Sequence, residues 1–219
     1  MALVDTMGEQ QRLEQLLDES KPPVPAECRA LHYLLATPFR YGAPYPNGSR
    51  FRRAGFTPGV YYASTSVATA VSEMSFRRLL FFAESPSTPW PANAAQYTAF
   101  SVRFRSSLGL DLDVAPFDQP AGQWRHPTDY SACQELADSA RAAGVAVLRY
   151  NSVRGPGRNV ALLTAKAFGS REPQQWQVWR LHAGPRGVRA ICSWPEQRLA
   201  FDRQAFAADP RLESMNWER

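Results

Sequence analysis

A single carboxylate stands in a long basic stretch of this sequence. Glu73 is the one acidic residue between Glu27 and Glu84. The same stretch contains seven arginines, which are Arg29, Arg40, Arg50, Arg52, Arg53, Arg77 and Arg78. Guanidinium groups bind phosphate oxygens through two parallel hydrogen bonds. The stretch therefore suits an anionic ligand, with one negative charge placed beside it.

Each candidate residue also has a purely structural explanation. Glu73 precedes Arg77 by four residues, and a Glu–Arg pair at this spacing on an exposed helix face contributes about 0.2–0.5 kcal/mol. Ser152, in YNSVRGPGRN, fits a turn at the end of a strand. Arg40 and Arg50 would be solvated arginines in loops. Only the joint order of these residues along the chain favours a shared site.

Other kinds of site are not favoured by the sequence. The three histidines are isolated and no HExxH or Cys/His cluster occurs, so we expect no metal site. Motifs of the GxxxxGK[ST], GxGxxG and GxSxG types are also missing. Direct nucleic-acid binding is not favoured, because no recognition motif occurs and most aromatic residues fall at core spacing. The Gly-Pro-Gly at 155–157 fits a turn, although it would also let the backbone approach a ligand.

The composition is that of one globular domain. The chain has 219 residues, of which 44% are hydrophobic, and a net charge of +5. Lys21 and Lys166 are the only lysines, and this bias toward arginine is typical of a GC-rich genome. The three cysteines are widely spaced, so we expect reduced, buried thiols. The absence of an apolar signal region and of an apolar span of about 18 residues predicts a cytoplasmic protein without a membrane segment.

The N-terminal part is expected to be helical and then irregular. EQQRLEQLLDESK (9–21) places its leucines on one helical face, and a second short helix is expected in AECRALHYLLA (26–36). We interpret this pair as an extension or a contact surface. Residues 37–59 are rich in Gly, Pro and aromatics, which indicates loops of the kind in which binding groups collect.

The rest of the chain alternates strands and helices. A short strand at 59–64 leads into a helix from Ser66 to about Phe82, which contains Glu73 and has the STS of 64–66 available for capping. Another helix is expected in 129–144, ended by its glycine. Further strands are expected at 96–107, 145–150, 159–164, 176–182, 187–194 and 197–202. Strands outnumber helices and the two are interspersed, so we predict an α+β fold with a mixed, largely antiparallel sheet and flanking helices.

The order of these motifs resembles the RES family, which is named for its Arg, Glu and Ser residues. The resemblance runs from about Leu31 to Phe201 and rests on LLATPFRY, GSRFRRAG, TPGVYYAS, TAVSEMSFRRL, DYSACQELADSARAAG and YNSVRGPGRNVALL. It implies a fold like that of the ADP-ribosyltransferases, in a bacterial toxin that degrades NAD and belongs to a two-gene toxin–antitoxin module. It further implies a catalytic domain at 31–219 preceded by a helical extension at 1–30.

Carried over residue by residue, the resemblance implies that six side chains line the pocket for NAD: Arg40, Tyr41, Arg50, Tyr62, Glu73 and Ser152. Glu73, Arg50 and Ser152 would carry the catalysis. We assign Arg50 as the second arginine of the pocket, after Arg40. Arg52 stays an alternative for this position, because GSRFRR departs from the Gly-Arg-Trp-Asn of many relatives. The STS of 64–66 also resembles an ADP-ribosyltransferase motif, but Glu73 follows it too soon for that layout, so we interpret it as a strand end and helix cap.

The implied reaction is cleavage of the nicotinamide–ribose bond of NAD, which builds positive charge on the sugar. Glu73 would stabilise that charge, Arg40 and Arg50 would hold the pyrophosphate, and Tyr62 would pack on nicotinamide. The acceptor stays open among water, phosphate and a protein side chain. The alternatives are an ADP-ribosyltransferase acting on a protein, or a basic binding module without chemistry. NAD enters as the substrate, and the implied partner is a helix-turn-helix antitoxin, within a homo- or hetero-oligomer.

Overall fold

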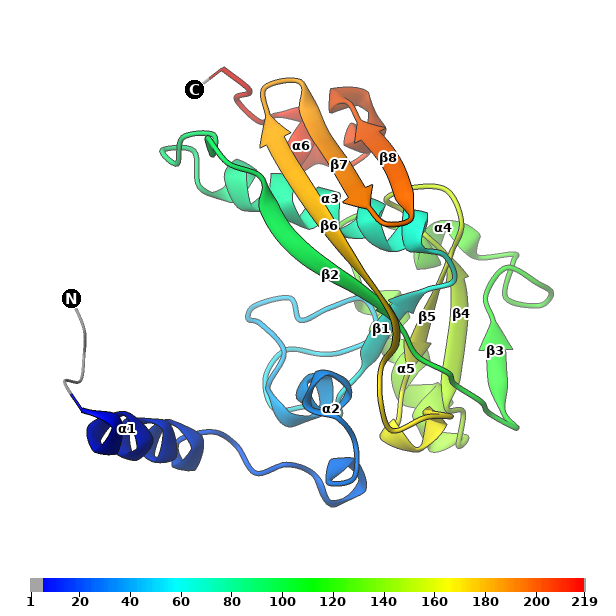
Figure 1. Ribbon diagram of the computed structural model, residues 1–219. Coiled ribbons are helices and arrows are strands. Elements are labelled where there is room, and N and C mark those ends of the chain that lie inside the picture. Colours follow the sequence, from blue (N-terminus) through cyan, green and yellow to red (C-terminus); the bar gives the residue numbers. More distant parts are fainter. Residues whose placement is uncertain (1–5, 219) are drawn as a thin grey trace.

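The computed structural model describes residues 6–218 and shows an α+β fold with two four-stranded sheets, which confirms the expected fold class (Figure 1). The six helices of this region are α1 (Met7–Glu19), α2 (Tyr33–Arg40), α3 (Val67–Glu84), α4 (Ala121–Trp124), α5 (Ser131–Ala142) and α6 (Pro210–Glu213). The eight strands are β1 (Tyr61–Ser64), β2 (Ala95–Ser101), β3 (Gly109–Asp111), β4 (Val147–Asn151), β5 (Arg158–Leu162), β6 (Gln174–Gly184), β7 (Gly187–Ser193) and β8 (Glu196–Phe201). The likeness to ADP-ribosyltransferases stays a prediction.

The two sheets lie one above the other in Figure 1. One is mixed and the other is purely antiparallel. The first sheet has the order β1-β5-β4-β3, in which β3 runs parallel to β4 and the other pairs are antiparallel. The second sheet has the order β2-β6-β7-β8 and is antiparallel throughout. In the first sheet, the register sets Asn159 of β5 between Ser64 of β1 and Tyr150 of β4. Polar and aromatic side chains are thereby brought together at one end of this sheet.

Helix α3 links the two sheets because its two halves make different contacts. Leu79 and Phe82 pack in one apolar core with Trp179 of the second sheet. Thr69 and Ser72, nearer the start of the helix, are buried and donate hydrogen bonds to the loop between β4 and β5. The helix therefore holds a loop of the first sheet against the core of the second sheet.

Several local predictions are confirmed. Helix α3 begins after Ser66, whose hydroxyl accepts a hydrogen bond from the N–H of Thr69, and Ser64 is the last residue of β1. Helix α5 is followed by Gly144 at a φ of +75°, a left-handed conformation that glycine adopts without strain. The three cysteines are free and buried.

Some elements differ from the expectation. The helix expected at 26–36 is interrupted, because Nδ1 of His32 accepts a hydrogen bond from the N–H of Leu34 and caps a helix that begins only at Tyr33. The strand expected at 96–107 ends at Ser101, where its register against β6 shifts. The sequence misses β3, α4 and α6, because three or four residues are too few for a periodic signal.

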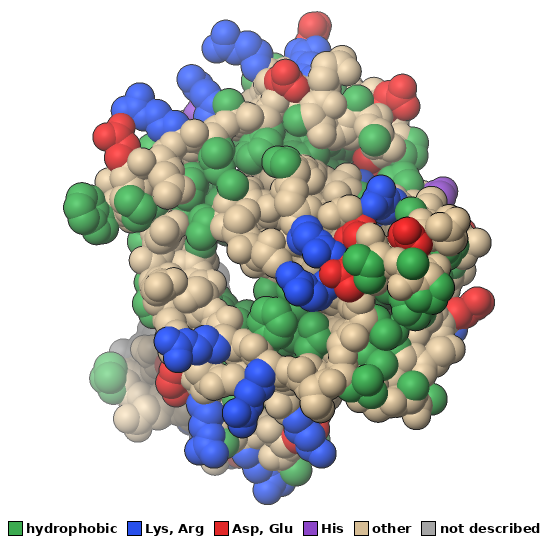
Figure 2. Space-filling view, turned by 90° about the vertical axis from the view of Figure 1, so that its right-hand side faces the viewer, with side chains coloured by type: hydrophobic (Ala, Val, Ile, Leu, Met, Phe, Trp, Pro, Cys, Tyr) green, Lys and Arg blue, Asp and Glu red, His purple; other side chains and the backbone are tan. Residues whose placement is uncertain are grey.

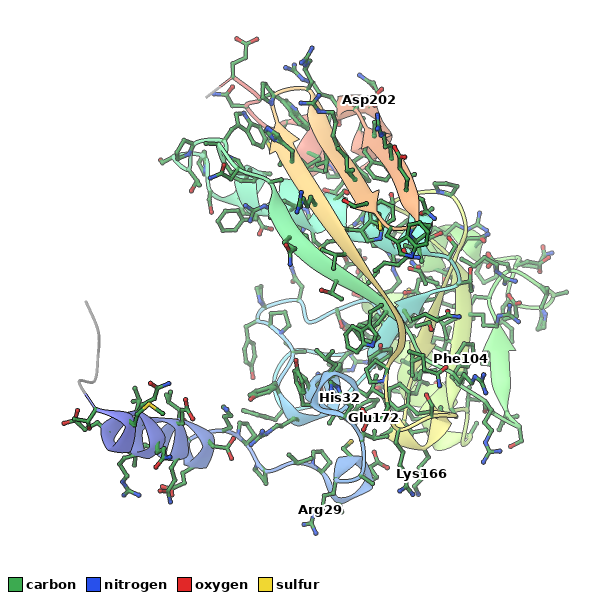
Figure 3. The ribbon with its side chains drawn as sticks, viewed as in Figure 1. Arg29, His32, Phe104, Lys166, Glu172 and Asp202 are labelled. Carbon is green, nitrogen blue, oxygen red and sulfur yellow. The ribbon has the colours of Figure 1, made fainter. Side chains whose placement is uncertain are left out.

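Helix α1 lies apart from the rest of the chain, with its side chains directed to several sides (Figures 1 and 3). The helix forms as expected, and a capping box of Thr6 and Glu9 closes its first turn. No residue of α1 is buried, so its leucines do not pack into any of the apolar clusters of residues 6–218. Within residues 6–218, no helix is long and apolar enough to cross a membrane.

Candidate functional site

The candidate site is a pocket of about 260 Å³ between α3 and the first sheet. Its walls come from the loop before β1, from β1 itself, from α3, and from the end of β4 with the start of β5. The residues that line it include Arg50, Tyr62, Glu73, Arg77, Tyr130, Tyr150, Arg154 and Asn159. The side of the molecule that carries β3 and α4 is hollowed near its middle, where Lys or Arg side chains stand beside apolar ones (Figure 2). Cationic and aromatic side chains thus surround one carboxylate in the pocket.

The carboxylate of Glu73 is held at one of its two oxygens. Its Oε1 accepts hydrogen bonds from Oγ of Ser152 at 2.7 Å and from Nδ2 of Asn159 at 2.6 Å. No hydrogen bond within residues 6–218 reaches Oε2, which leaves that oxygen for a ligand. The pairing with Arg77 that helical spacing suggests does not form among the described ion pairs. Glu73 therefore points across to the first sheet, toward Ser152 and Asn159.

Close packing of the β4–β5 loop on α3 places Ser152 beside Glu73. The hydroxyls of Thr69 and Ser72 donate hydrogen bonds of 2.8 and 2.5 Å to carbonyl groups of this loop. A Cβ atom on Gly155 would collide with Oγ of Ser72, and one on Gly157 would collide with Oγ1 of Thr69. Both glycines are therefore needed for the approach of the loop to the helix.

Asn159 connects Glu73 to the first sheet. The residue is 5% exposed, and its amide group donates to Glu73 while its Oδ1 accepts a hydrogen bond of 2.7 Å from Oγ of Ser64. The antiparallel pairing of β1 with β5 sets Ser64 opposite Asn159. Both ends of the buried amide are thus satisfied, which fixes its orientation and that of the carboxylate.

Two tyrosines supply aromatic surface to the pocket. The residue Tyr62 is 37% exposed, and its hydroxyl accepts a hydrogen bond from the N–H of Phe51 and lies 2.9 Å from Oγ of Ser49. Burial of this hydroxyl raises the pKa of Tyr62, although its hydrogen bonds with Ser49 and with the N–H of Phe51 act in the opposite direction. Burial also raises the pKa of Tyr150 well above its usual range. Both phenols therefore stay neutral at pH 7 and offer rings with a polar edge.

Arg50 lines the pocket but is not a solvated loop arginine. It is 8% exposed, and its guanidinium donates hydrogen bonds to the carbonyl groups of Trp124 at 2.5 Å and His126 at 3.1 Å. It also lies over the ring of Tyr130, 5.0 Å from the centroid. These contacts tie its loop to the segment before α5, so Arg50 supports the fold as well as the pocket. A guanidinium has five N–H donors, which leaves Arg50 donors for a ligand.

Arg52, the other candidate for the second arginine, is directed away from the pocket. It is 8% exposed and donates hydrogen bonds to the carbonyl groups of Pro38, Tyr41 and Thr57 at 3.0, 2.7 and 2.8 Å. Burial lowers the pKa of Arg52. Its donors are occupied by the main chain of α2 and of the loop that follows it, so Arg50 is the one of the two arginines that lines the cavity.

Arg40 and Tyr41 are not brought to this pocket. Nε of Arg40 donates a hydrogen bond of 2.5 Å to the carbonyl group of Pro22, and its guanidinium lies 5.6 Å from the centroid of the Tyr41 ring. The same arginine lies 3.9 Å from Asp18 of α1. The expected placement of both residues beside Glu73 differs from this arrangement, because α2 continues to Arg40 and turns its side chain toward the N-terminal linker.

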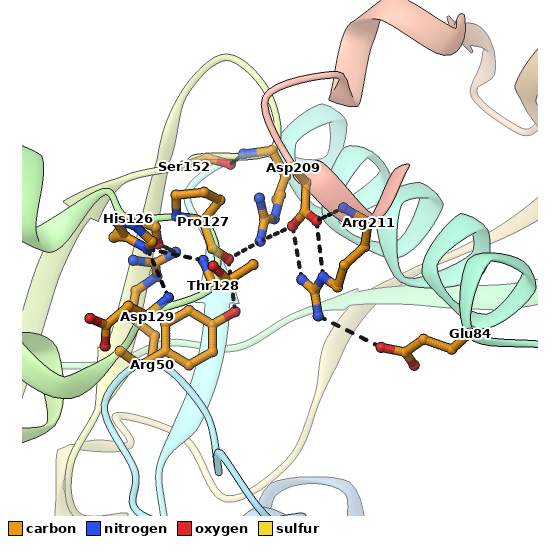
Figure 4. Close-up of polar contacts among 11 residues, drawn as sticks. Arg50, Glu84, His126, Pro127, Thr128, Asp129, Ser152, Asp209 and Arg211 are labelled. Atoms are coloured by element: carbon orange, nitrogen blue, oxygen red, sulfur yellow. Dashed lines mark hydrogen bonds and ion pairs between the residues drawn. The ribbon is translucent and has the colours of Figure 1, made fainter. Parts of the chain in front are cut away.

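A buried ion pair braces the loop that carries Ser152. Arg154 is 5% exposed and Asp209 is 1% exposed, and they pair at 3.0 Å while Arg154 also donates to the carbonyl group of Pro127 (Figure 4). The side chain of Arg211 donates two further bonds to Asp209, of 2.9 and 2.8 Å. Burial acts to raise the pKa of Asp209, but the bonds from Arg211 and the charge of Arg154 outweigh it and hold that pKa below its usual value. The C-terminal segment is therefore part of the support of the pocket.

Sequence reasoning missed four of the residues that surround Glu73, namely Tyr130, Tyr150, Arg154 and Asn159. Of these four, only Asn159 could have been recognised from the sequence. It is the first residue of the otherwise apolar run NVALL, and asparagine is depleted in strands. The two tyrosines fall at positions typical of core aromatics. Arg154 is one of many arginines, and nothing near it in the sequence indicates its buried partner.

Comparison with known protein families gives one match. A family model described as the RES domain matches residues 24–183, which is 160 of the 219 residues and so more than half of the chain. The matched region contains Arg50, Glu73, Ser152 and Asn159, whereas α1 and Asp209 lie outside it. No curated protein matches the chain.

Proposed function

Because the chain belongs to the RES domain family, we propose that it cleaves the nicotinamide–ribose bond of NAD and acts as the toxin of a toxin–antitoxin module. RES domains are associated with NAD-degrading toxins of such modules. The observation that carries the proposal is the carboxylate of Glu73, held by Ser152 and Asn159 in a pocket lined with arginines and tyrosines.

The size of the pocket suits one end of a dinucleotide. Its volume of about 260 Å³ is slightly below the roughly 300–1,000 Å³ of small-molecule sites, so it has room for part of a dinucleotide and not for the whole. We place the nicotinamide riboside half inside, with the nicotinamide ring against Tyr62 and Tyr150. The pyrophosphate then lies at the mouth, between Arg50 and the exposed Arg77. Arg77 takes the phosphate-binding role that the sequence assigned to Arg40.

The chemistry needs one negative charge near the ribose. When the glycosidic bond breaks, its electron pair goes to the nicotinamide nitrogen, so nicotinamide leaves as a neutral molecule and the sugar becomes a cation of the oxocarbenium type. A carboxylate oxygen close to that sugar stabilises the transition state more than the ground state. Ser152 and Asn159 hold Oε1 of Glu73 before any substrate binds, so Oε2 meets the ribose with little reorganisation. A neutral leaving group needs no strong general acid, which agrees with a single carboxylate.

The acceptor of the ADP-ribosyl group decides the reaction class. Attack by water gives ADP-ribose, and attack by inorganic phosphate gives its phosphorylated form. We propose that one of these two small acceptors is used. The runner-up, transfer to a protein side chain, would leave ADP-ribose covalently bound to a target.

The proposed function is tested with purified protein and NAD. Nicotinamide release is followed with and without inorganic phosphate, and the sugar product is identified by mass spectrometry. Release with a small-molecule product is expected, while release that requires an added protein and labels it would favour the runner-up. No nicotinamide release in any of these mixtures, from protein shown to be folded, would contradict the enzymatic proposal. In cells, expression should lower NAD and arrest growth, and a neighbouring helix-turn-helix antitoxin should relieve both effects.

A further inference from the structure

The leucines of α1 are left uncovered. Leu16 and Leu17 are 47% and 52% exposed, and they share a helical face with Leu13. No residue of α1 is buried, and its ion pair with the rest of the chain, from Asp18 to Arg40, is long at 3.9 Å. Isolated helices shorter than about 12–15 residues are marginal in water. A surface that covers this leucine stripe would therefore stabilise α1.

The charge of α1 is opposite to that of the rest of the molecule. The helix has four carboxylates and one arginine, which gives a net charge of −3, and the whole chain carries +5. The part of the chain outside α1 therefore carries +8. Helical spacing puts Glu14 on one side of the leucine stripe and Glu19 on the other. A surface that accepts this helix should be apolar in its middle and basic around it.

The outer face of the second sheet combines apolar side chains with basic ones. Its opposite face packs against α3, while the outer face carries the half-buried His182 and exposes Val178, Arg180, Arg189, Ile191 and Arg198. Val178 and Ile191 are 45% and 47% exposed. The register places Ile191 of β7 between Arg180 of β6 and Arg198 of β8.

The arginines of this face are largely without counter-ions. Glu196 pairs with Arg198 at 2.8 Å. Neither Arg180 nor Arg189 takes part in any ion pair found in residues 6–218. The outer face therefore keeps at least two free positive charges for an acidic partner.

We propose that α1 of one molecule docks across the outer face of the second sheet of another copy, and that the exchange is mutual. A helix of 13 residues is about 20 Å long, and four strands spaced about 4.8 Å apart form a surface of similar width. A two-fold dimer makes this contact twice. The leucine stripe covers Val178 and Ile191, while the carboxylates of α1 face Arg180 and Arg189. This inference does not depend on the proposed enzymatic function.

The linker after α1 argues against docking within one molecule. The linker is KPPVP (21–25), in which three prolines favour a semi-rigid extended chain. Nε of Arg40 fixes this linker to the end of α2 by its bond to the carbonyl group of Pro22. In Figure 1, α1 and α2 lie at the lower end of the molecule, whereas β7 and β8 lie at the upper end. The helix is therefore held away from the sheet of its own chain but is free to reach that of a second copy.

The test measures the mass of the full chain by light scattering and sedimentation over a range of concentrations. Two charge-reversed variants are made, Glu14→Lys with Glu19→Lys on the helix, and Arg180→Glu with Arg189→Glu on the sheet. All four side chains are exposed, so the variants should keep the wild-type melting temperature. Arg29→Glu, at an exposed site directed away from both surfaces, is the matched control (Figure 3). We expect a wild-type and control dimer, and at least tenfold weaker association of each variant.

The two variants also test each other when they are mixed. The reversed helix of one then meets the reversed sheet of the other, and the two unchanged surfaces meet as well, so a heterodimer should form with recovered affinity. Leu16→Ser with Leu17→Ser should weaken the wild-type dimer to a similar degree. A wild-type monomer at all concentrations, a dimer that the helix variants leave intact, or a mixture that does not associate would overturn the proposal. Binding of duplex DNA by the sheet face of a monomer would also overturn it.

Discussion

Glu73→Gln removes one charge and keeps the volume of the side chain, so it separates catalysis from folding. The carbonyl oxygen of glutamine can still accept the bonds that Ser152 and Asn159 give to Oε1. Hydrogen bonds to a charged group contribute about 1.5–3 kcal/mol and neutral ones about 0.5–1.5 kcal/mol. Two weakened bonds, discounted because Glu73 is partly exposed, cost about 1–2 kcal/mol of unfolding free energy. For a chain of this size, the melting temperature should fall by about 2–8 °C.

Turnover should fall much further. Loss of one preorganised electrostatic partner of a developing charge typically lowers kcat by on the order of a hundredfold, or about 2.7 kcal/mol. The cation exists only in the transition state, so the KM for NAD should change less than about threefold. The assay follows the initial rate of nicotinamide release over a range of NAD concentrations, and calorimetry reports the melting temperature of the same samples.

Glu84→Gln is the matched control for this experiment. Glu84 is the last residue of the same helix and forms an exposed ion pair of 3.6 Å with Arg211, away from the pocket lining. Its substitution should leave kcat unchanged. A folded Glu73→Gln protein with near-wild-type turnover would refute the reasoning, even with the family membership intact. An equal loss in both variants would assign the effect to the helix and not to the carboxylate.

Four further substitutions test the pocket and its support. Asp209→Asn leaves Arg154 buried without its counter-ion and should lower the unfolding free energy, measured in urea, by about 3–5 kcal/mol. Because the pKa of Asp209 is lowered in the folded state, this difference between wild type and variant should be full above about pH 4 and shrink below it. A difference that stays constant down to pH 2 would contradict this. Arg77→Ala should weaken NAD binding at low salt without changing the melting temperature. Arg50→Ala should lower both the affinity for NAD and the melting temperature, and a melting temperature equal to that of the wild type would argue against the structural role of Arg50. Ser152→Ala should lower kcat about tenfold, more than its stability loss explains, and an early-melting variant with normal turnover per folded molecule would leave Ser152 a purely structural role.

Local patterns in the sequence are sufficient for the main elements. Apolar spacing predicts α3, and the STS before it predicts the strand end and the cap that Ser66 provides. Helix and strand periods depend on residues that are near neighbours in the chain, which is why these predictions hold. The order of motifs also predicts that Glu73 and Ser152 share a site, and the structure places Oγ of Ser152 2.7 Å from Oε1 of Glu73.

Only the tertiary structure decides what else surrounds that carboxylate. Asn159 reaches Glu73 through the register of β1 with β5, and a slip of one residue would turn its amide to the other face of the sheet. Arg40 is drawn to the carbonyl group of Pro22, which removes it from the pocket that the motif order predicts for it. Arg154 finds its counter-ion in Asp209, outside the matched family region. Each of these choices depends on contacts between distant segments, and no pattern of neighbouring residues carries that information.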